Sequence, residues 1–121
     1  MDYKVSFLPS KGIVKIKNEG RLSFHKVRKY SAEATKLGHL NRCNKYLIDH
    51  SDTDLEHGIY KLHTDGGALQ QFGFMNNDRI AIVISRKKDG HFFEERKAQE
   101  AKWCSKKYFS DIDKAIEWLN R

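Results

Sequence analysis

Five consecutive apolar residues, 80–84, form the strongest hydrophobic run in the chain, and four of them are β-branched. β-branched residues favour a strand over a helix. Consecutive apolar residues place apolar side chains on both faces of a strand, which indicates that both faces are covered. The pattern therefore predicts a central strand over residues 78–85, in an α/β sheet with helices on each side.

The N-terminal segment alternates between apolar and polar positions. Residues 3–8 and 13–17 both alternate, and the turn between them, residues 9–12, holds the only proline of the chain. Two alternating strands joined by a short turn predict a hairpin with one face toward water. Residues 18–20 are expected to end its second strand.

The next segment, after residue 20, has apolar residues at the spacing of an α-helix. Ser23 is the expected N-cap, Lys26 falls on the solvent face, and Gly38 stands where a glycine just past the helix end is expected. The expected core face recurs at steps of three and four: Phe24, Val27, Tyr30, Ala34 and Leu37. The pattern predicts a helix that ends just before Gly38.

Residues 44–49 predict a third, buried strand, and residues 50–54 a polar loop rich in helix-capping side chains. A helix is expected from about residue 55, with a break at residues 66–67 and a short helical turn over 68–72. After the central strand we expect a charged loop over 86–90 and a helix over 92–101.

The C-terminal segment predicts a strand over residues 103–109, whose two lysines suggest a place near a sheet edge. A closing helix follows, with the Ser110 oxygen expected to reach the amide of Asp113. The predicted order is β-β-α-β-α-β-α-β-α in a single α/β domain over residues 1–121. The sheet is mixed, with an antiparallel N-terminal hairpin and mostly parallel strands beyond it.

Composition adds little to this picture. The chain has 121 residues, 39% hydrophobic and 32% charged, with no apolar window long enough to span a membrane and an N-terminus too polar for a signal peptide. We therefore expect a cytoplasmic protein without membrane insertion. The net charge of +7 is divided evenly, +4 over residues 1–60 and +3 over 61–121. An even excess is typical of a solvated surface, so a nucleic-acid partner is not favoured.

Several stretches, in this order, resemble the SpoIIAA-like superfamily, which holds the STAS domains and small stand-alone bacterial proteins related to them. The resemblance covers nearly the whole chain and concerns core and cap positions. It is carried by the hairpin of residues 3–17, Gly20-Arg21-Leu22-Ser23, Tyr46-Leu47-Ile48-Asp49, residues 79–85, Phe92-Phe93-Glu94, Tyr108-Phe109-Ser110-Asp111 and Ala115-Ile116-Glu117-Trp118-Leu119. It implies a SpoIIAA-like fold.

The resemblance also implies partner switching, in which an anti-sigma-factor antagonist binds a kinase and is released by serine phosphorylation. In that family the serine follows the third strand in an Asp-Ser-Ser-Gly-like motif. Here the place is taken by residues 49–54, which contain no Ser-Ser-Gly. Ser51 or Thr53 could occupy the position, but Asp52 and Asp54 would repel a phosphate.

The candidate binding residues lie where two strands end. They are Asp49, Ser51, Asp52 and Thr53 after the third strand, and Arg86 and Lys87 after the central strand. Ligand sites of open α/β sheets gather at the carboxyl ends of strands, so a small anion or a protein partner could bind there. The alternative is that Asp52, Thr53 or Asp54 caps a helix and the basic loop is merely solvated. A metal held by His50, Asp52, Asp54 and His57 matches no recognised ligand spacing, so we expect none.

The sequence names no nucleophile–base pair and no cofactor motif. We therefore expect a non-enzymatic regulatory or binding module that recognises a protein partner or a small ligand. The alternatives are an apolar-ligand or lipid carrier of CRAL-TRIO type and, less favoured, a basic nucleic-acid-binding domain. The carrier would need a cavity lined by residues such as Ile59, Leu62, Leu69, Phe72 and Phe74. A homodimer through a helix face or an edge strand is also compatible with the sequence.

Overall fold

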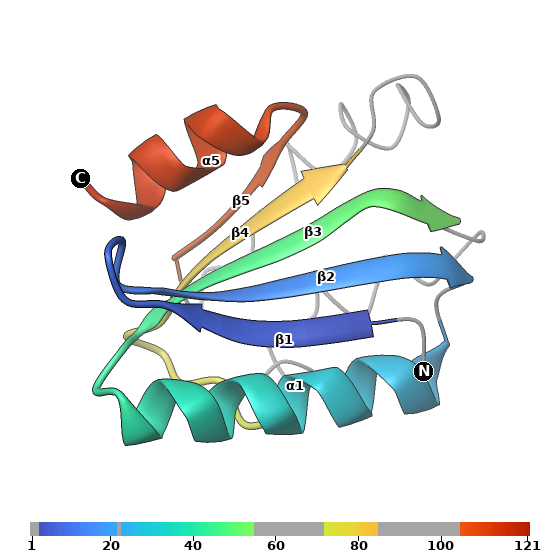
Figure 1. Cartoon of the computed structure of the whole chain (residues 1–121), viewed down its shortest axis with the longest axis horizontal. Coiled ribbons are helices and arrows are strands. Elements are labelled where there is room, and N and C mark those ends of the chain that lie inside the picture. Colours follow the sequence, from blue (N-terminus) through green and yellow to red (C-terminus); the bar gives the residue numbers. More distant parts are fainter. Residues whose placement is uncertain (1–2, 22, 55–71, 85–104) are drawn as a thin grey trace.

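A computed structural model describes residues 3–21, 23–54, 72–84 and 105–121 (Figure 1). Its elements are β1 (Tyr3–Leu8), β2 (Ile13–Arg21), α1 (Phe24–Leu40), β3 (Lys45–Asp54), β4 (Arg79–Ile84), β5 (Ser105–Phe109) and α5 (Ile112–Leu119). The strands form one sheet in the order β1-β2-β3-β4-β5. β1 and β2 are antiparallel and the other neighbours are parallel, which confirms the predicted mixed α/β sheet.

The sheet is covered by α1 on one face and by α5 on the other (Figure 1). The predicted strand over 78–85 is the interior strand β4, and all five residues 80–84 are buried. Ile80, Ile82 and Ile84 belong to the cluster under α1, whereas Ala81 and Val83 pack with α5. The apolar run therefore supplies side chains to both cores, as its pattern predicted.

The predicted end of β2 and the predicted loop after β3 are both wrong. β2 continues to Arg21 and β3 to Asp54, because the polar ends of the two strands pair with each other beyond a register shift between Lys17 and Glu19. Backbone hydrogen bonds hold a strand together whether or not its side chains are apolar, so the hydrophobic pattern stops earlier than the strand does.

Helix α1 begins where predicted, since Ser23 Oγ accepts a hydrogen bond from Lys26 N at 3.2 Å. Its predicted end is wrong: the helix runs past Gly38 to Leu40, with Asn41 as C-cap. The solvent position assigned to Lys26 is also wrong. The Lys26 side chain is buried and its Nζ donates to Glu19 O at 2.8 Å and Arg21 O at 3.1 Å, which ties α1 to the end of β2.

The C-terminal segment matches its prediction in outline. Among the described strands β5 lies at one edge of the sheet, although one of its two lysines, Lys106, is buried. The helix cap differs: Asp111 is the N-cap of α5, and its Oδ1 accepts from Asp113 N at 2.8 Å, where we expected Ser110. Arg79 contacts the C-terminal end of α5. Its Cζ lies 4.4 Å from the centroid of the Trp118 ring, and its guanidinium donates a hydrogen bond to Trp118 O at 2.7 Å.

Replacing Asp111 with alanine should lower the free energy of unfolding by about 1 kcal/mol, the usual effect of losing an N-cap oxygen. Urea unfolding followed by tryptophan fluorescence measures the change. Ser110→Ala is the matched control and should leave stability almost unchanged, because the exposed Ser110 is not the cap residue. Equal losses for the two variants would contradict the assignment of the cap.

The helices expected near residues 55 and 68 and over 92–101, and the loop over 86–90, lie wholly or almost wholly outside the described residues. Within the described part of the chain, no helix is both long and apolar enough to cross a bilayer.

Candidate functional site

A polar cluster lies on the α5 side of the sheet, toward the carboxyl ends of β2 and β3. α5 packs over β3, β4 and β5 through Ala115 and Leu119, which contact Leu47, Ala81 and Val83. Lys17 of β2 faces Asp49 of β3 in the sheet register. The cluster therefore occupies the part of this face that lies next to the area packed by α5.

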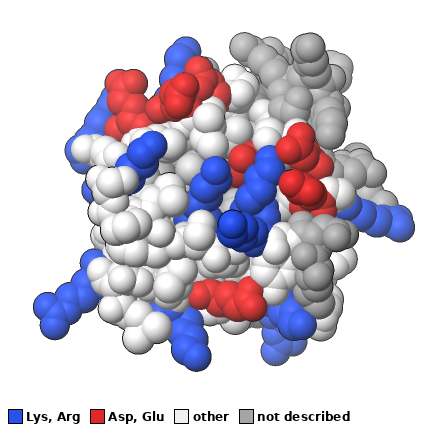
Figure 2. Space-filling view, viewed as in Figure 1, with Lys and Arg blue, Asp and Glu red and all other residues white. Residues whose placement is uncertain are grey.

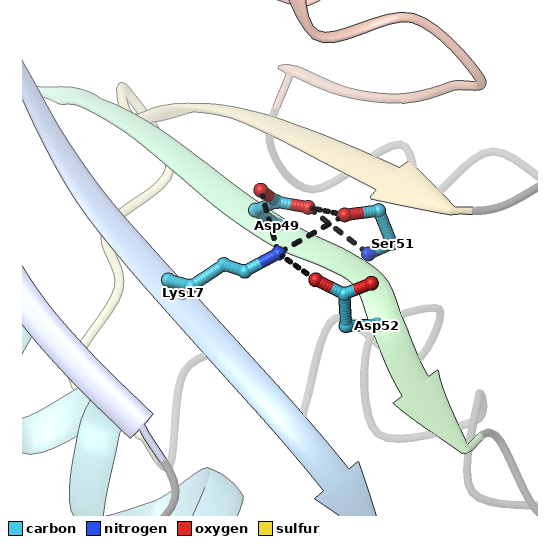
Figure 3. Close-up of polar contacts among 4 residues, drawn as sticks. All are labelled: Lys17, Asp49, Ser51 and Asp52. Atoms are coloured by element: carbon cyan, nitrogen blue, oxygen red, sulfur yellow. Dashed lines mark hydrogen bonds and ion pairs between the residues drawn. The ribbon is translucent and has the colours of Figure 1, made fainter.

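Lys17 is the centre of the cluster (Figure 3). Its Nζ lies 2.7 Å from Asp52 Oδ2, 3.1 Å from Ser51 Oγ and 3.3 Å from Asp49 Oδ2. Ser51 in turn donates to Asp49 Oδ1, from Oγ at 2.7 Å and from its backbone N at 3.0 Å. One ammonium group and one hydroxyl thus join two carboxylates into a closed network.

The irregular backbone explains how three residues of β3 reach one lysine. In a regular strand Asp49 and Ser51 point to one face and Asp52 to the other. The register shift opposite Lys17 and the Asp49–Ser51 hydrogen bonds break this alternation. Irregularities of this kind redirect side chains near functional sites.

The charges in the cluster are stable at neutral pH. Burial alone would raise the pKa of Asp49, but the Ser51 hydrogen bonds and the Lys17 charge outweigh it and hold that pKa below its ordinary value of 3.8. Burial alone would lower the pKa of Lys17, yet the hydrogen bond to Asp52 and the charge of Asp49 leave it raised. Both shifts favour ionised partners, so Asp49 is a weak base and Lys17 keeps its proton.

The network has one buried end and one exposed end. Only 7% of the Asp49 side chain is exposed, against 27% for Lys17 and 66% for Asp52. Two carboxylates against one ammonium leave the cluster with a net charge of −1. Its chemistry is suited to binding a hydrogen-bond donor or a cation presented from outside.

Three of the six predicted site residues come together here: Asp49, Ser51 and Asp52. Thr53 lies beside them in β3, and Arg86 and Lys87 fall outside the described residues. The suggestion that Asp52 caps a helix is wrong, because Asp52 is part of a strand.

Lys17 was missed by sequence reasoning. The available signal was weak: Lys17 stands at a solvent position of an alternating strand. Its pairing with Asp49 follows from the register between β2 and β3, which the sequence does not state.

His50 lies apart from this cluster although it separates Asp49 from Ser51 in the sequence. It is buried at 1% exposure under α1, with its Nε2 3.4 Å from Tyr30 Oη. His50 and Asp52 therefore do not converge. Among the described residues no group of three histidine, cysteine, aspartate or glutamate side chains is placed to hold a metal ion.

Comparison with known proteins identifies the fold. No protein-family model matches the chain, and no curated protein matches its sequence. The chain is similar to a solved structure of the anti-sigma factor antagonist SpoIIAA in its unphosphorylated form, with a TM-score of 0.56, 12% identity, and coverage of 97% of this chain and 96% of that one. The fold is therefore SpoIIAA-like, which confirms the resemblance and the predicted fold class.

Proposed function

We propose that this protein is a non-enzymatic regulatory module that binds a protein partner through the cluster Lys17–Asp49–Ser51–Asp52. The observation that carries the proposal is the ion-pair network itself, which fixes the exposed Asp52 carboxylate at the carboxyl end of β3. A charged group held in one orientation by partly buried partners is well suited to fixing the orientation of a bound protein.

The chemistry of the cluster favours a protein partner over the small anion considered from sequence. The Lys17 charge is already shared by two carboxylates, so the net charge of −1 repels an anion. It attracts a lysine or, better, an arginine, whose guanidinium can donate to Asp52 and Ser51 together. The solved SpoIIAA is described as an antagonist of an anti-sigma factor, and this supports a protein partner for the same fold.

The lipid-carrier alternative receives no support from the described residues. Phe72 and Phe74 are 4% and 3% exposed and pack in the core cluster under α1, with Phe74 edge-on to the Tyr46 ring. Their place is explained by packing. Ile59, Leu62 and Leu69 lie outside the described residues.

The test is affinity purification from native cells at low salt, followed by native mass spectrometry. We expect the wild-type chain to retain a protein in fixed stoichiometry, and Asp52→Arg to lose it by like-charge repulsion. Glu117→Arg is the matched control, because it makes the same charge change at a 70% exposed side chain of α5 and should retain the partner.

Thermal unfolding of both variants checks that they are folded, since an exposed ion pair contributes at most about 1 kcal/mol. The proposal fails if Asp52→Arg retains the partner as well as Glu117→Arg does. It fails equally if the only added mass is a small molecule.

A further inference from the structure

The open edge of the sheet is a second surface of interest, distinct from the cluster around Lys17. β1 is the first strand in the sheet order and, among the described elements, pairs only with β2. An edge strand offers backbone N–H and C=O groups on its unpaired side. A further strand can therefore add there, if the adjoining side chains accept it.

A groove lies between this edge and α1. It has a volume of about 640 Å³ and is lined by Tyr3, Lys4 and Val5 of β1 and by Lys29, Glu33 and Leu37 of α1. The three α1 residues are spaced by four, so they form one stripe along the helix facing the strand. The groove is thus bounded by backbone on one side and by a helix face on the other.

The apolar part of the groove is incompletely covered. Val5 and Leu37 pack against the core cluster but remain only partly buried, whereas Ile16, the register partner of Val5 on β2, is fully buried. An apolar side chain of an added segment would cover the exposed parts of Val5 and Leu37. The hydrophobic contribution would be about 25 cal/mol for each Å² removed from water.

The charges beside the groove are mainly positive. Lys4 and Lys29 are both exposed, and the one acidic residue, Glu33, is engaged by the Tyr3 hydroxyl in a hydrogen bond that raises the pKa of Tyr3 to about 12. Figure 2 shows basic side chains gathered over β1 and β2, and others along α1, with an acidic patch between the two groups. Acidic side chains would be attracted from both sides.

We propose that the β1 edge binds an extended acidic segment of a partner protein, which adds as a strand and places carboxylates near Lys4 and Lys29. Charge complementarity favours this occupant over a second copy of the chain. Two copies each carry +7, and a lysine on an edge strand opposes pairing with an identical edge.

The test uses a short labelled peptide of valine and glutamate at low salt. Because strand side chains alternate between faces, valine and glutamate alternate on the face toward α1, and glutamate occupies the opposite face, next to Lys4. Two control peptides replace glutamate with lysine, or carry N-methyl groups on alternate amides and so cannot add as a strand. We expect the glutamate peptide to bind about tenfold more tightly than either control. Amide shifts and hydrogen-exchange protection should map to residues 3–8.

The double variant Lys4→Glu/Lys29→Glu should lose about tenfold in affinity. Lys11→Glu/Lys114→Glu, with the same charge change at exposed positions away from the groove, should bind as the wild type does. The proposal would be overturned if the N-methylated peptide bound as tightly as the glutamate peptide, or if the two double variants bound the glutamate peptide equally. Amide shifts outside β1 would also overturn it. So would concentration-dependent protection of β1 without peptide, which would indicate a second copy on this edge. None of these results depends on Asp52, so failure here leaves the proposed function standing.

Discussion

Lowering the pH from 7 to 5 is expected to reduce the free energy of unfolding by about 2 kcal/mol through His50 alone. His50 lies fully inside the protein under α1, and burial, followed by the positive charges of Lys26 and Lys17, lowers its pKa to about 3. In the unfolded chain the same imidazole has its ordinary pKa of 6.5. Between these two values the unfolded chain binds the extra proton, so stability is complete above about pH 6.5 and decreases as the pH falls toward 3.

The slope of this loss identifies its cause. Each pH unit inside the window changes the free energy of unfolding by about 1.4 kcal/mol for one histidine. Asp49 also makes the protein less stable as the pH falls, but in a lower pH range. Its pKa is held below 3.8, so its contribution to stability is lost only as the pH falls through that lower value. The interval from pH 5 to 7 therefore reports on His50 without interference from Asp49.

Urea unfolding of His50→Gln across this interval provides the measurement. We expect the variant to be less stable at pH 7, because it loses the contact with Tyr30, but to show a much flatter pH dependence. His25→Gln, at an exposed position of α1, should keep the wild-type slope. If His50→Gln and the wild type have the same slope between pH 5 and 7, the buried imidazole is not the source.

The predictions from sequence succeeded where burial alone determines structure. The alternation over residues 3–8 and 13–17 and the apolar run 80–84 fixed the hairpin and an interior strand, because a strand with a covered face must be apolar at every second position. The predictions failed where hydrogen bonds of polar groups determine where a strand ends or whether a side chain is buried. The polar continuation of β3 depends on its pairing with β2, which lies far earlier in the chain. The buried ammonium of Lys26 depends on backbone carbonyl groups at the end of β2, which the hydrophobic pattern does not reveal.

The residues of the candidate site also differ in whether they could be predicted from the sequence. Asp49, Ser51 and Asp52 were selected from the sequence because ligand sites usually form at the carboxyl ends of parallel strands, and the structure brings these three side chains together. Lys17 was not found, because its role depends on which residue of β3 lies opposite it. A register shift of one residue would turn Lys17 to the other face of the sheet. The site is thus a property of strand pairing more than of any local motif.

Replacing Gly38 with alanine is expected to destabilise the protein by about 1–3 kcal/mol, the usual range for overpacking a filled interior. In an ordinary helix the same change stabilises by about 1 kcal/mol, because alanine is the better helix former. Gly38 differs because a Cβ there would collide with Tyr46 Oη and lie 2.9 Å from Tyr46 Cζ and 3.0 Å from Cys43 O. The glycine that sequence reasoning placed past the helix end is kept inside the helix by the close approach of β3.

A double-mutant cycle with Tyr46→Phe separates the collision from helix propensity. Within the described part of the protein the buried Tyr46 hydroxyl has no hydrogen-bond partner, so removing it should change stability little. Gly38→Ala should then be less harmful in the Tyr46→Phe background, with a coupling of about 1 kcal/mol or more, and the remaining loss reflects the contact with Cys43 O. Ala32→Gly, at an exposed position of α1, calibrates the effect of propensity alone. A stabilising Gly38→Ala in both backgrounds would show that β3 does not approach α1 as closely as described.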